Sequence, residues 1–272
     1  MIQTRDREPG GPRKRRSELR AYLAAVGEAA AVTGAEAVLR DVAVHLHRAL
    51  HRTLPQISNG SRPGQAGAIA PNPAAPNPAE SLLARWDGTA PREEVAPPLG
   101  LCSADLLGLV YESLVDRDTR RRIGAFYTPT ALADQLAAAT LGPMNWGGTV
   151  RICDPASGPG ALLLAAARHA AAQAIEDSRL VLTGMDLDPL AASVATTALH
   201  LAHPDSTTCI LIGDALQEGA WEGQGPFDAV LANPPFLSQL ARRTARSRPE
   251  AAELSDRFGA PAAGYADTAG LF

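Results

Sequence analysis

Four consecutive residues, Asn233-Pro234-Pro235-Phe236, have the residue types and order to do specific chemistry. They follow an apolar run, 227–232, that reads as a short buried strand. Two prolines directly after a strand stop its ladder of hydrogen bonds and hold the backbone extended and rigid. The Asn233 side-chain oxygen and the Pro234 carbonyl could then accept hydrogen bonds from an amino group, while Phe236 stacks on a planar ring. The plainer alternative is a strand that ends in a proline-rich turn.

Three acidic residues also follow predicted strands directly. The strands are expected at 150–153, 180–185 and 209–212, and the acids are Asp154, Asp186 and Asp214. Helices expected at 161–175 and 189–201 alternate with these strands, which predicts a parallel sheet. All carboxyl ends of parallel strands share one edge, so we expect the three carboxylates to line one crevice beside Asn233. A loop cap is the alternative role for each of them.

The first of these acids opens a loop, Asp154-Pro155-Ala156-Ser157-Gly158-Pro159-Gly160. Its glycines let backbone N–H groups approach a ligand closely. The loop lacks the third glycine of the G-x-G-x-x-G pattern, and Asp154 would repel a pyrophosphate. The carboxylate would instead favour a ligand with ammonium and sulfonium charge, such as S-adenosylmethionine. Asp186 is suited to the ribose diol of that ligand, because a carboxylate can accept both hydroxyl hydrogens.

An aromatic segment upstream, 124–129, has the sequence Gly-Ala-Phe-Tyr-Thr-Pro and precedes an amphipathic helix that reaches Leu141. Thr130 is expected to cap that helix, and the free N–H groups of its first turn could face a polar or anionic ligand group. The alternative is an ordinary entry from a loop into a helix.

In this order, the motifs resemble those of the N6-adenine DNA methyltransferases, and most closely their type I modification-subunit and type IIG-like group. The segments that carry the resemblance are 124–129, 154–160, 184–189, 213–216 and 233–236. The likeness covers about Leu106 to the end of the chain. The Asn-Pro-Pro-aromatic motif also occurs in glutamine and guanine-N2 methyltransferases, but the aromatic segment upstream is characteristic of the DNA-adenine group.

The resemblance implies roles for the matching residues, with S-adenosylmethionine as the cofactor and no metal. The residues expected to wrap its methionine part are Phe126, Tyr127, Thr128 and Pro129. Those expected to form its pocket are Asp154, Ala156, Gly158 and Gly160, with Asp186 on the ribose and Asp214 on the adenine amino group. The implied catalytic residues are Asn233, Pro234, Pro235 and Phe236. They would hold an adenine that has been flipped out of DNA, with Phe236 stacked on the base.

Composition limits the class of protein. The chain has 272 residues, 46% of them hydrophobic, which is enough for one core and an appendage. A net charge of −4 argues against tight nucleic-acid binding by the chain as a whole. The three cysteines form no C-x-x-C pair, which suggests neither zinc nor disulfides and fits a reducing cytosol. We find no secretory signal and no apolar run long enough to span a membrane, and we expect a cytoplasmic protein.

The fold class that we expect is α/β. It is a Rossmann-like S-adenosylmethionine-dependent methyltransferase sheet, with about four of seven strands present, preceded by a helical N-terminal region. The expected segments are a disordered basic tail (1–16), a helical segment (17–54) that breaks at Thr33-Gly34, a proline-rich linker (55–98), a helical region with the cofactor-wrapping loop (99–146), and a partial catalytic domain (147–272). Ordered structure is expected to resume near Leu99.

Three functions remain open at this point. The first is N6-adenine methylation of DNA in a restriction-modification or related system, with a specificity or target-recognition subunit or domain as a further partner. The second is methylation of protein glutamine or RNA, and the third is a non-catalytic remnant. Because the sheet is incomplete, we expect weak or absent activity of the chain alone. Four arginines could contact DNA phosphates or form a solvated helix face: Arg242, Arg243, Arg246 and Arg248.

Overall fold

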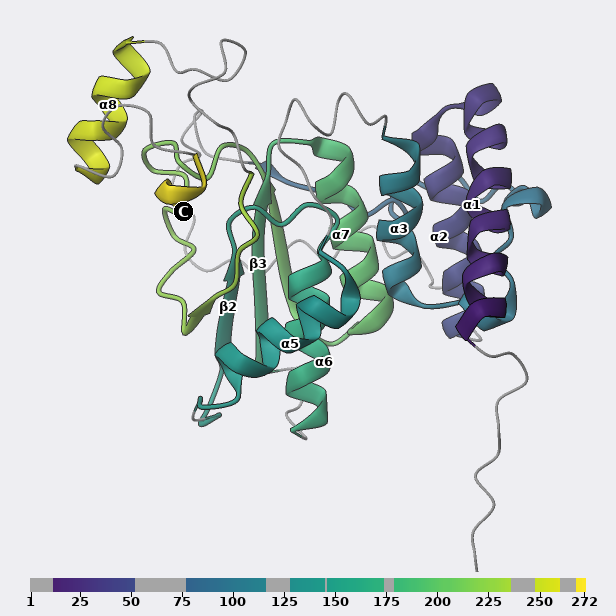
Figure 1. Ribbon diagram of the computed structural model, residues 1–272, viewed down its shortest axis with the longest axis horizontal. Coiled ribbons are helices and arrows are strands. Elements are labelled where there is room, and N and C mark those ends of the chain that lie inside the picture. The colour runs from purple at the N-terminus through teal and green to yellow at the C-terminus, as the bar shows by residue number, and fades with distance from the viewer. Residues whose placement is uncertain are drawn as a thin grey trace, which may run out of the picture.

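The computed structural model describes residues 12–51, 77–115, 128–144, 146–173, 179–235, 248–259 and 268–272. These residues form one sheet with the strand order β1-β4-β3-β2-β5 (Figure 1). The strands are β1 (Asn77–Pro78), β2 (Val150–Asp154), β3 (Leu180–Asp186), β4 (Thr207–Ile212) and β5 (Ala229–Val230). Strands β4, β3, β2 and β5 pair in parallel, which confirms the expected Rossmann-like α/β fold.

The helices of the described part of the chain are α1 (Pro12–Thr33), α2 (Ala35–Leu50), α3 (Ala104–Leu114), α5 (Thr130–Leu141), α6 (Ala161–Ala172), α7 (Pro189–Ala202) and α8 (Arg248–Phe258). All of them except α8 form layers on one side of this sheet (Figure 1). Short 3-10 turns lie at Glu93–Val95, Leu99–Leu101 and Thr268–Leu271. Helices α6 and α7 lie against the sheet, and α3, α2 and α1 follow outward, whereas α8 lies at the opposite end of the molecule (Figure 1).

Small residues allow close packing between the loop after β2 and the helices. Gly160 has a φ of 91°, and a Cβ added there would lie 3.1 Å from the Cβ of Ala195 in α7. The left-handed conformation and the close approach both require glycine. Gly184 in β3 is equally confined, because an added Cβ would lie 2.9 Å from both Ile210 Cδ1 and Ser157 Cβ. These contacts fix the loop after β2 against β3 and α7.

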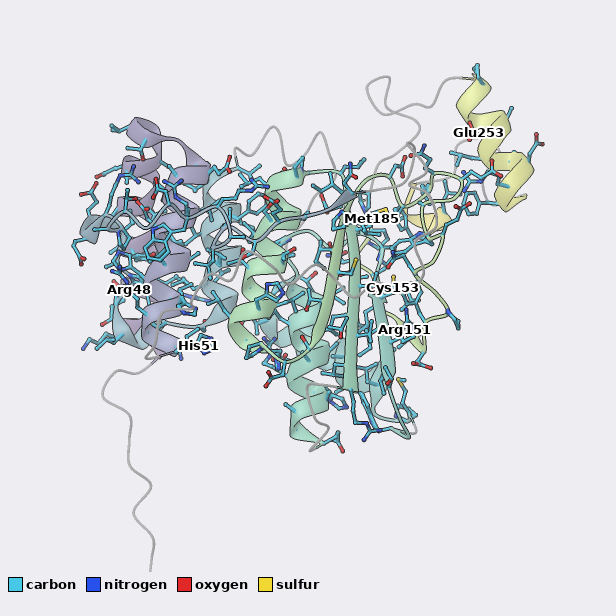
Figure 2. All side chains as sticks on the ribbon, turned by 180° about the vertical axis from the view of Figure 1, so that it is seen from behind. Arg48, His51, Arg151, Cys153, Met185 and Glu253 are labelled. Atoms are coloured by element: carbon cyan, nitrogen blue, oxygen red, sulfur yellow. The ribbon has the colours of Figure 1, made fainter. Side chains whose placement is uncertain are left out.

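The other face of the sheet is covered by the chain between β4 and β5. Met185 and Leu211 point to this side and pack with Ala220 in a small second core, with Trp221 against it. Figure 2 shows Met185 on the sheet, well away from the N-terminal helices. The sheet is therefore sandwiched between helices on one face and a loop on the other, which explains why β2 and β3 are buried over most of their length.

The structure corrects the expected boundaries in two places. Helix α1 begins at Pro12, so the last residues of the tail expected at 1–16 are helical. Residues 77–98 of the expected linker are also ordered, since β1 pairs antiparallel with β4 and Leu82 and Val95 are buried. Proline does not prevent this, because an edge strand has one side without ladder partners.

Other details differ by a few residues. The predicted break at Thr33-Gly34 is confirmed, with Gly34 in the left-handed region at φ 88°. Thr130 does not cap α5, because the helix begins at Thr130 itself and follows Pro129 without a side-chain cap. Strand β5 is shorter than the expected run 227–232, because only its two central residues pair with β2.

Candidate functional site at the carboxyl edge of the sheet

The loop after β2 bends over β3 and reaches the acid at its end. The Ser157 N–H donates to the Met185 carbonyl at 2.9 Å, and the Gly158 N–H donates to Asp186 Oδ2 at 2.8 Å. Gly158 has a φ of 49°, and a Cβ added there would meet no other atom within 4 Å. Its outer side therefore faces open space, where a ligand could contact the backbone. Asp154 stands at the start of this loop, and Asp186 accepts the hydrogen bond from its Gly158.

Each aspartate also caps its own loop. Asp154 Oδ1 accepts the Ala156 N–H at 3.1 Å, Asp186 Oδ1 the Asp188 N–H at 2.8 Å, and Asp214 Oδ1 the Leu216 N–H at 2.9 Å. The alternative role as loop caps therefore describes all three correctly. These bonds leave each carboxylate able to accept further hydrogen bonds, because each of its oxygens has two lone pairs. A cap of this kind also holds the carboxylate in one orientation towards a ligand.

Burial changes the proton affinity of two of these acids. Asp154 is 1% exposed, and burial raises its pKa to about 7, with the Ala156 N–H opposing and the Asp186 charge adding to the shift. Burial likewise raises the pKa of Asp186, against the two N–H groups that stabilise its charged form. Both acids therefore lack a compensating positive charge among the described residues that contact them. A cationic ligand group at this edge would supply one.

The motif that begins at Asn233 meets the upstream segment at the same edge. Asn233 Nδ2 donates to Thr128 Oγ1 at 3.0 Å, and Thr128 is 7% exposed. Pro234 and Pro235 follow Asn233 and are half-buried. Leu231, just before them, donates its N–H to the Cys153 carbonyl at 2.9 Å, so the motif leaves the sheet directly beside the end of β2. Asn233 thus lies next to the strand that ends in Asp154.

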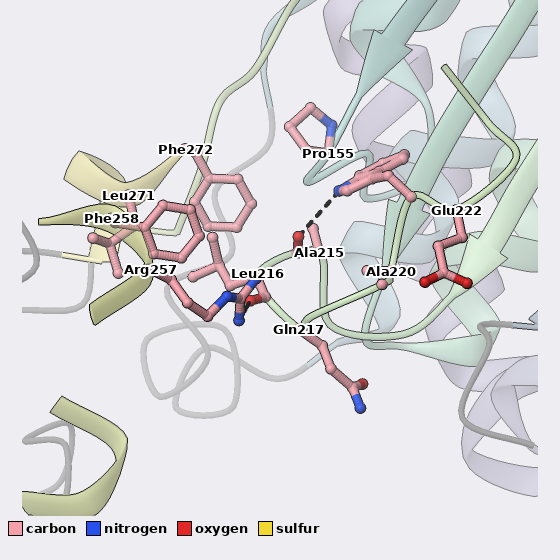
Figure 3. Close-up of a pocket in the computed structure, with 12 residues that line it drawn as sticks. Pro155, Ala215, Leu216, Gln217, Ala220, Glu222, Arg257, Phe258, Leu271 and Phe272 are labelled. Atoms are coloured by element: carbon pink, nitrogen blue, oxygen red, sulfur yellow. Dashed lines mark hydrogen bonds between the residues drawn. The ribbon is translucent and has the colours of Figure 1, made fainter. Parts of the chain in front are cut away.

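An open pocket adjoins the end of β4. It has a volume of about 480 Å³, and its lining includes Pro155, Leu216, Trp221, Phe258 and Phe272 (Figure 3). In Figure 3 the rings of Phe258 and Phe272 lie near each other and near Leu216. Trp221 is held by a hydrogen bond from Nε1 to the Ala215 carbonyl at 3.0 Å. Its walls combine apolar and aromatic side chains with the polar Gln217, Glu222 and Arg257, and it lies next to the segment that follows the exposed acid Asp214.

The structure thus brings most of the expected residues to one edge. Asp154 and Asp186 end β2 and β3, and Ala156, Gly158 and Asp214 lie on the loops after β2 and β4. The residues beside them are Thr128, Pro129, Asn233, Pro234 and Pro235. Gly160, at the end of the loop after β2, packs closely on α7. Three expected residues, Phe126, Tyr127 and Phe236, lie outside the described residues, as do Arg242, Arg243 and Arg246.

Two residues of α3 that the sequence did not single out touch these loops. Tyr111 donates its hydroxyl to Asp188 Oδ2, and a Cβ added at Gly108 would lie 3.4 Å from Pro159 Cβ. The buried side chains of this helix include Leu106, Leu107, Val110 and Tyr111. The signal that could have found Tyr111 is its position one helical turn after Leu107.

A parallel sheet with a glycine-containing loop after one strand and an acid at the end of the next defines a Rossmann-like α/β protein. The model of the N-6 DNA methylase family matches residues 102–269, which is more than half of the chain. The chain belongs to this family. The resemblance inferred from the sequence motifs is thereby confirmed.

Solved structures give a second comparison. The type IIG restriction endonuclease BpuSI is 18% identical, with a TM-score of 0.52 over 88% of this chain and 29% of its own, and it supports the fold. The methyltransferase subunit of a type I restriction-modification system from Streptococcus thermophilus is 27% identical over 53% of this chain and 32% of its own, with a TM-score of 0.38. The chain therefore spans about a third of the length of these two proteins.

No helix among the described residues has both the length and the apolar character of a membrane span. Within the same ranges, no three His, Cys, Asp or Glu side chains gather as ligands of a metal ion would.

Proposed function

We propose that this chain carries the catalytic site of a DNA methyltransferase that transfers a methyl group from S-adenosylmethionine to the N6 amino group of adenine. The observation that carries the proposal is the hydrogen bond between Asn233 and Thr128, because it joins the two motifs that would hold the target amino group and the cofactor. Membership of the N-6 DNA methylase family supports both the reaction and the substrate.

The residues at the edge of the sheet fit S-adenosylmethionine. Asp186 offers one remaining lone pair on each oxygen to the ribose diol, and the open side of Gly158 admits a ligand to the backbone. The pocket next to Asp214 has aromatic side chains on which an adenine ring could stack, and the exposed carboxylate could accept from its amino group. The high pKa of Asp154 falls when a cation comes near, which favours a ligand with ammonium and sulfonium charge. The cofactor supplies an electrophilic methyl group on its sulfonium.

Asn233 and Pro234 would act on the target by positioning it. The lone pair of an adenine amino group is delocalised into the ring, so the nitrogen is a poor nucleophile. Two acceptors, Asn233 Oδ1 and the Pro234 carbonyl, would hold both amino hydrogens and favour a pyramidal nitrogen aimed at the methyl group. The bond from Asn233 Nδ2 to Thr128 supports this role, because it turns the amide oxygen away from Thr128. An amide cannot serve as a general base, so the increase in the rate of methyl transfer would come from orientation of the amino group.

The target adenine must leave the DNA duplex to reach this position, which costs a few kcal/mol of unstacking. Stacking on the side chain of Phe236 would offset part of that cost. We propose DNA as the substrate, which membership of the N-6 DNA methylase family supports, and a target-recognition subunit or domain as a further partner.

The test is transfer of labelled methyl from S-adenosylmethionine by the purified chain to plasmid DNA, RNA or protein, with Asn233→Ala as the paired variant. Label on the N6 position of DNA adenine that disappears in the variant would support the proposal. Label on protein or RNA and not on DNA would favour the second candidate function. Absence of transfer together with absence of cofactor binding in calorimetry would favour the non-catalytic remnant.

A further inference from the structure

Tyr111 links the upstream helical region to the loop after β3. It lies in α3, is 8% exposed, and donates its hydroxyl to Asp188 Oδ2 at 2.5 Å. The other oxygen of Asp188 accepts the Leu190 N–H at 2.8 Å and so caps α7. Both oxygens of Asp188 therefore have a partner, one from α7 and one from α3. The orientation of this carboxylate depends on the position of α3.

Asp188 in turn holds Asp186. Its backbone N–H donates to Asp186 Oδ1 at 2.8 Å, while the Gly158 N–H donates to Oδ2 at 2.8 Å. These two bonds fix the plane of the Asp186 carboxylate and leave one lone pair on each oxygen. Two adjacent hydroxyls could donate to these lone pairs only if the carboxylate keeps that plane. A shift of the Asp188 peptide would rotate it.

We propose that Tyr111 is a positioning residue for the ribose diol of S-adenosylmethionine, acting through Asp188 on Asp186. This inference rests on the proposed function of the site. It assigns to the upstream helices a task in cofactor binding, because α3 packs between them and α7 (Figure 1). Helix α3 also approaches the glycine-containing loop, where Gly108 faces Pro159, so one helix supports both loops that would hold the cofactor.

The chemistry of Tyr111 agrees with a donor role. Burial and the neighbouring carboxylates of Asp188 and Asp186 raise the pKa of Tyr111 far above its usual range. The hydroxyl therefore keeps its proton wherever the protein is folded. A phenylalanine would preserve the ring and its packing and would remove only the donor.

A positioning role of Tyr111 can be distinguished from a purely structural one by comparing a ligand that has the ribose hydroxyls with one that lacks them. Binding of S-adenosylhomocysteine and of its 2′,3′-dideoxy analogue is measured by competition, so that weak ligands also give a value. Tyr111→Phe should weaken binding of the first about three- to tenfold and of the analogue by less than about twofold, since only the first contacts Asp186 through hydroxyls. The matched control is Tyr22→Phe, which removes another buried hydroxyl, bonded to the Val95 carbonyl at 3.0 Å, and should change neither affinity.

A double-mutant cycle with Asp186→Asn tests the route of action. In that background Tyr111→Phe should add less than about twofold to the loss, because the group through which it acts is already altered. Equal losses for both ligands, or a full additional loss in the Asp186→Asn background, would overturn the inference and leave the proposed function intact. If the wild-type chain binds neither ligand, the proposed function fails, and the inference fails with it.

Discussion

The side-chain amide of Asn233 donates to the hydroxyl of Thr128 at 3.0 Å, although 105 residues separate the two in the chain. The contact joins the loop after β5 to the entry of α5. Because the hydroxyl oxygen of Thr128 accepts from Nδ2, the contact turns Oδ1 of Asn233 away from Thr128.

Replacement of Thr128 should therefore impair methyl transfer according to the hydroxyl and not the size of the side chain. Thr128→Val removes the acceptor at nearly constant volume and should lower kcat about tenfold to a hundredfold, since the reaction depends on orientation. Thr128→Ser keeps the hydroxyl and should stay within about threefold of the wild type. Labelled methyl transfer to DNA measures both, and equal rates for the two variants would contradict the assigned contact.

The affinity for S-adenosylmethionine should fall as the pH drops below about 7. Burial raises the pKa of Asp154 to about 7, so the carboxyl is ionised above this pH and protonated below it. A cationic ligand binds the ionised form better, and below pH 7 it must first displace a proton, which costs up to about tenfold in affinity per pH unit. Calorimetry between pH 5.5 and 8.5 tests this, with Asp154→Asn as the variant that should bind weakly at every pH. A wild-type affinity that is constant over this range would exclude the role of Asp154.

The free energy of unfolding without ligand should depend on pH through the same residue. The folded chain holds the Asp154 proton more tightly than the unfolded chain, so stability is greatest below about pH 4 as far as this group is concerned and decreases as the pH rises towards 7. The difference is on the order of 2–4 kcal/mol. Urea unfolding of the wild type and of Asp154→Asn at pH 5 and pH 8 isolates it. Identical pH dependence in both proteins would show that Asp154 is not the cause.

Gly184→Ala should destabilise the loop after β2. The added Cβ would lie 2.9 Å from Ile210 Cδ1 and from Ser157 Cβ, which forces the loop or the strand to shift and costs about 1–3 kcal/mol. Gly27→Ala in α1 is the matched control, because a Cβ there meets nothing within 4 Å and alanine favours a helix by up to about 1 kcal/mol. The melting temperature should fall for Gly184→Ala and rise for Gly27→Ala. A neutral result at Gly184 would mean that the loop is free to move.

The parallel core of the fold could be predicted from local sequence alone. Strands β2, β3 and β4 are apolar runs bounded by polar or glycine residues, and each run is long enough to predict a strand from its own residues. The segment 77–98 could not be predicted in this way. Its proline-rich composition is typical of a linker, and its order comes from pairing with β4 and from the contact of Leu82 with Thr197, neither of which has a local signal.

Part of the candidate site could likewise be predicted from the sequence, and part could not. The residue order of the five motifs determined that acids and an asparagine would follow parallel strands, and topology then requires them to share an edge. Only the tertiary structure decided which groups touch: Asn233 with Thr128, Gly158 with Asp186, and Tyr111 with Asp188. The pattern of a strand depends on residues that are neighbours in the sequence. A hydrogen bond between distant side chains depends on how helices and loops pack, which is a property of the whole chain.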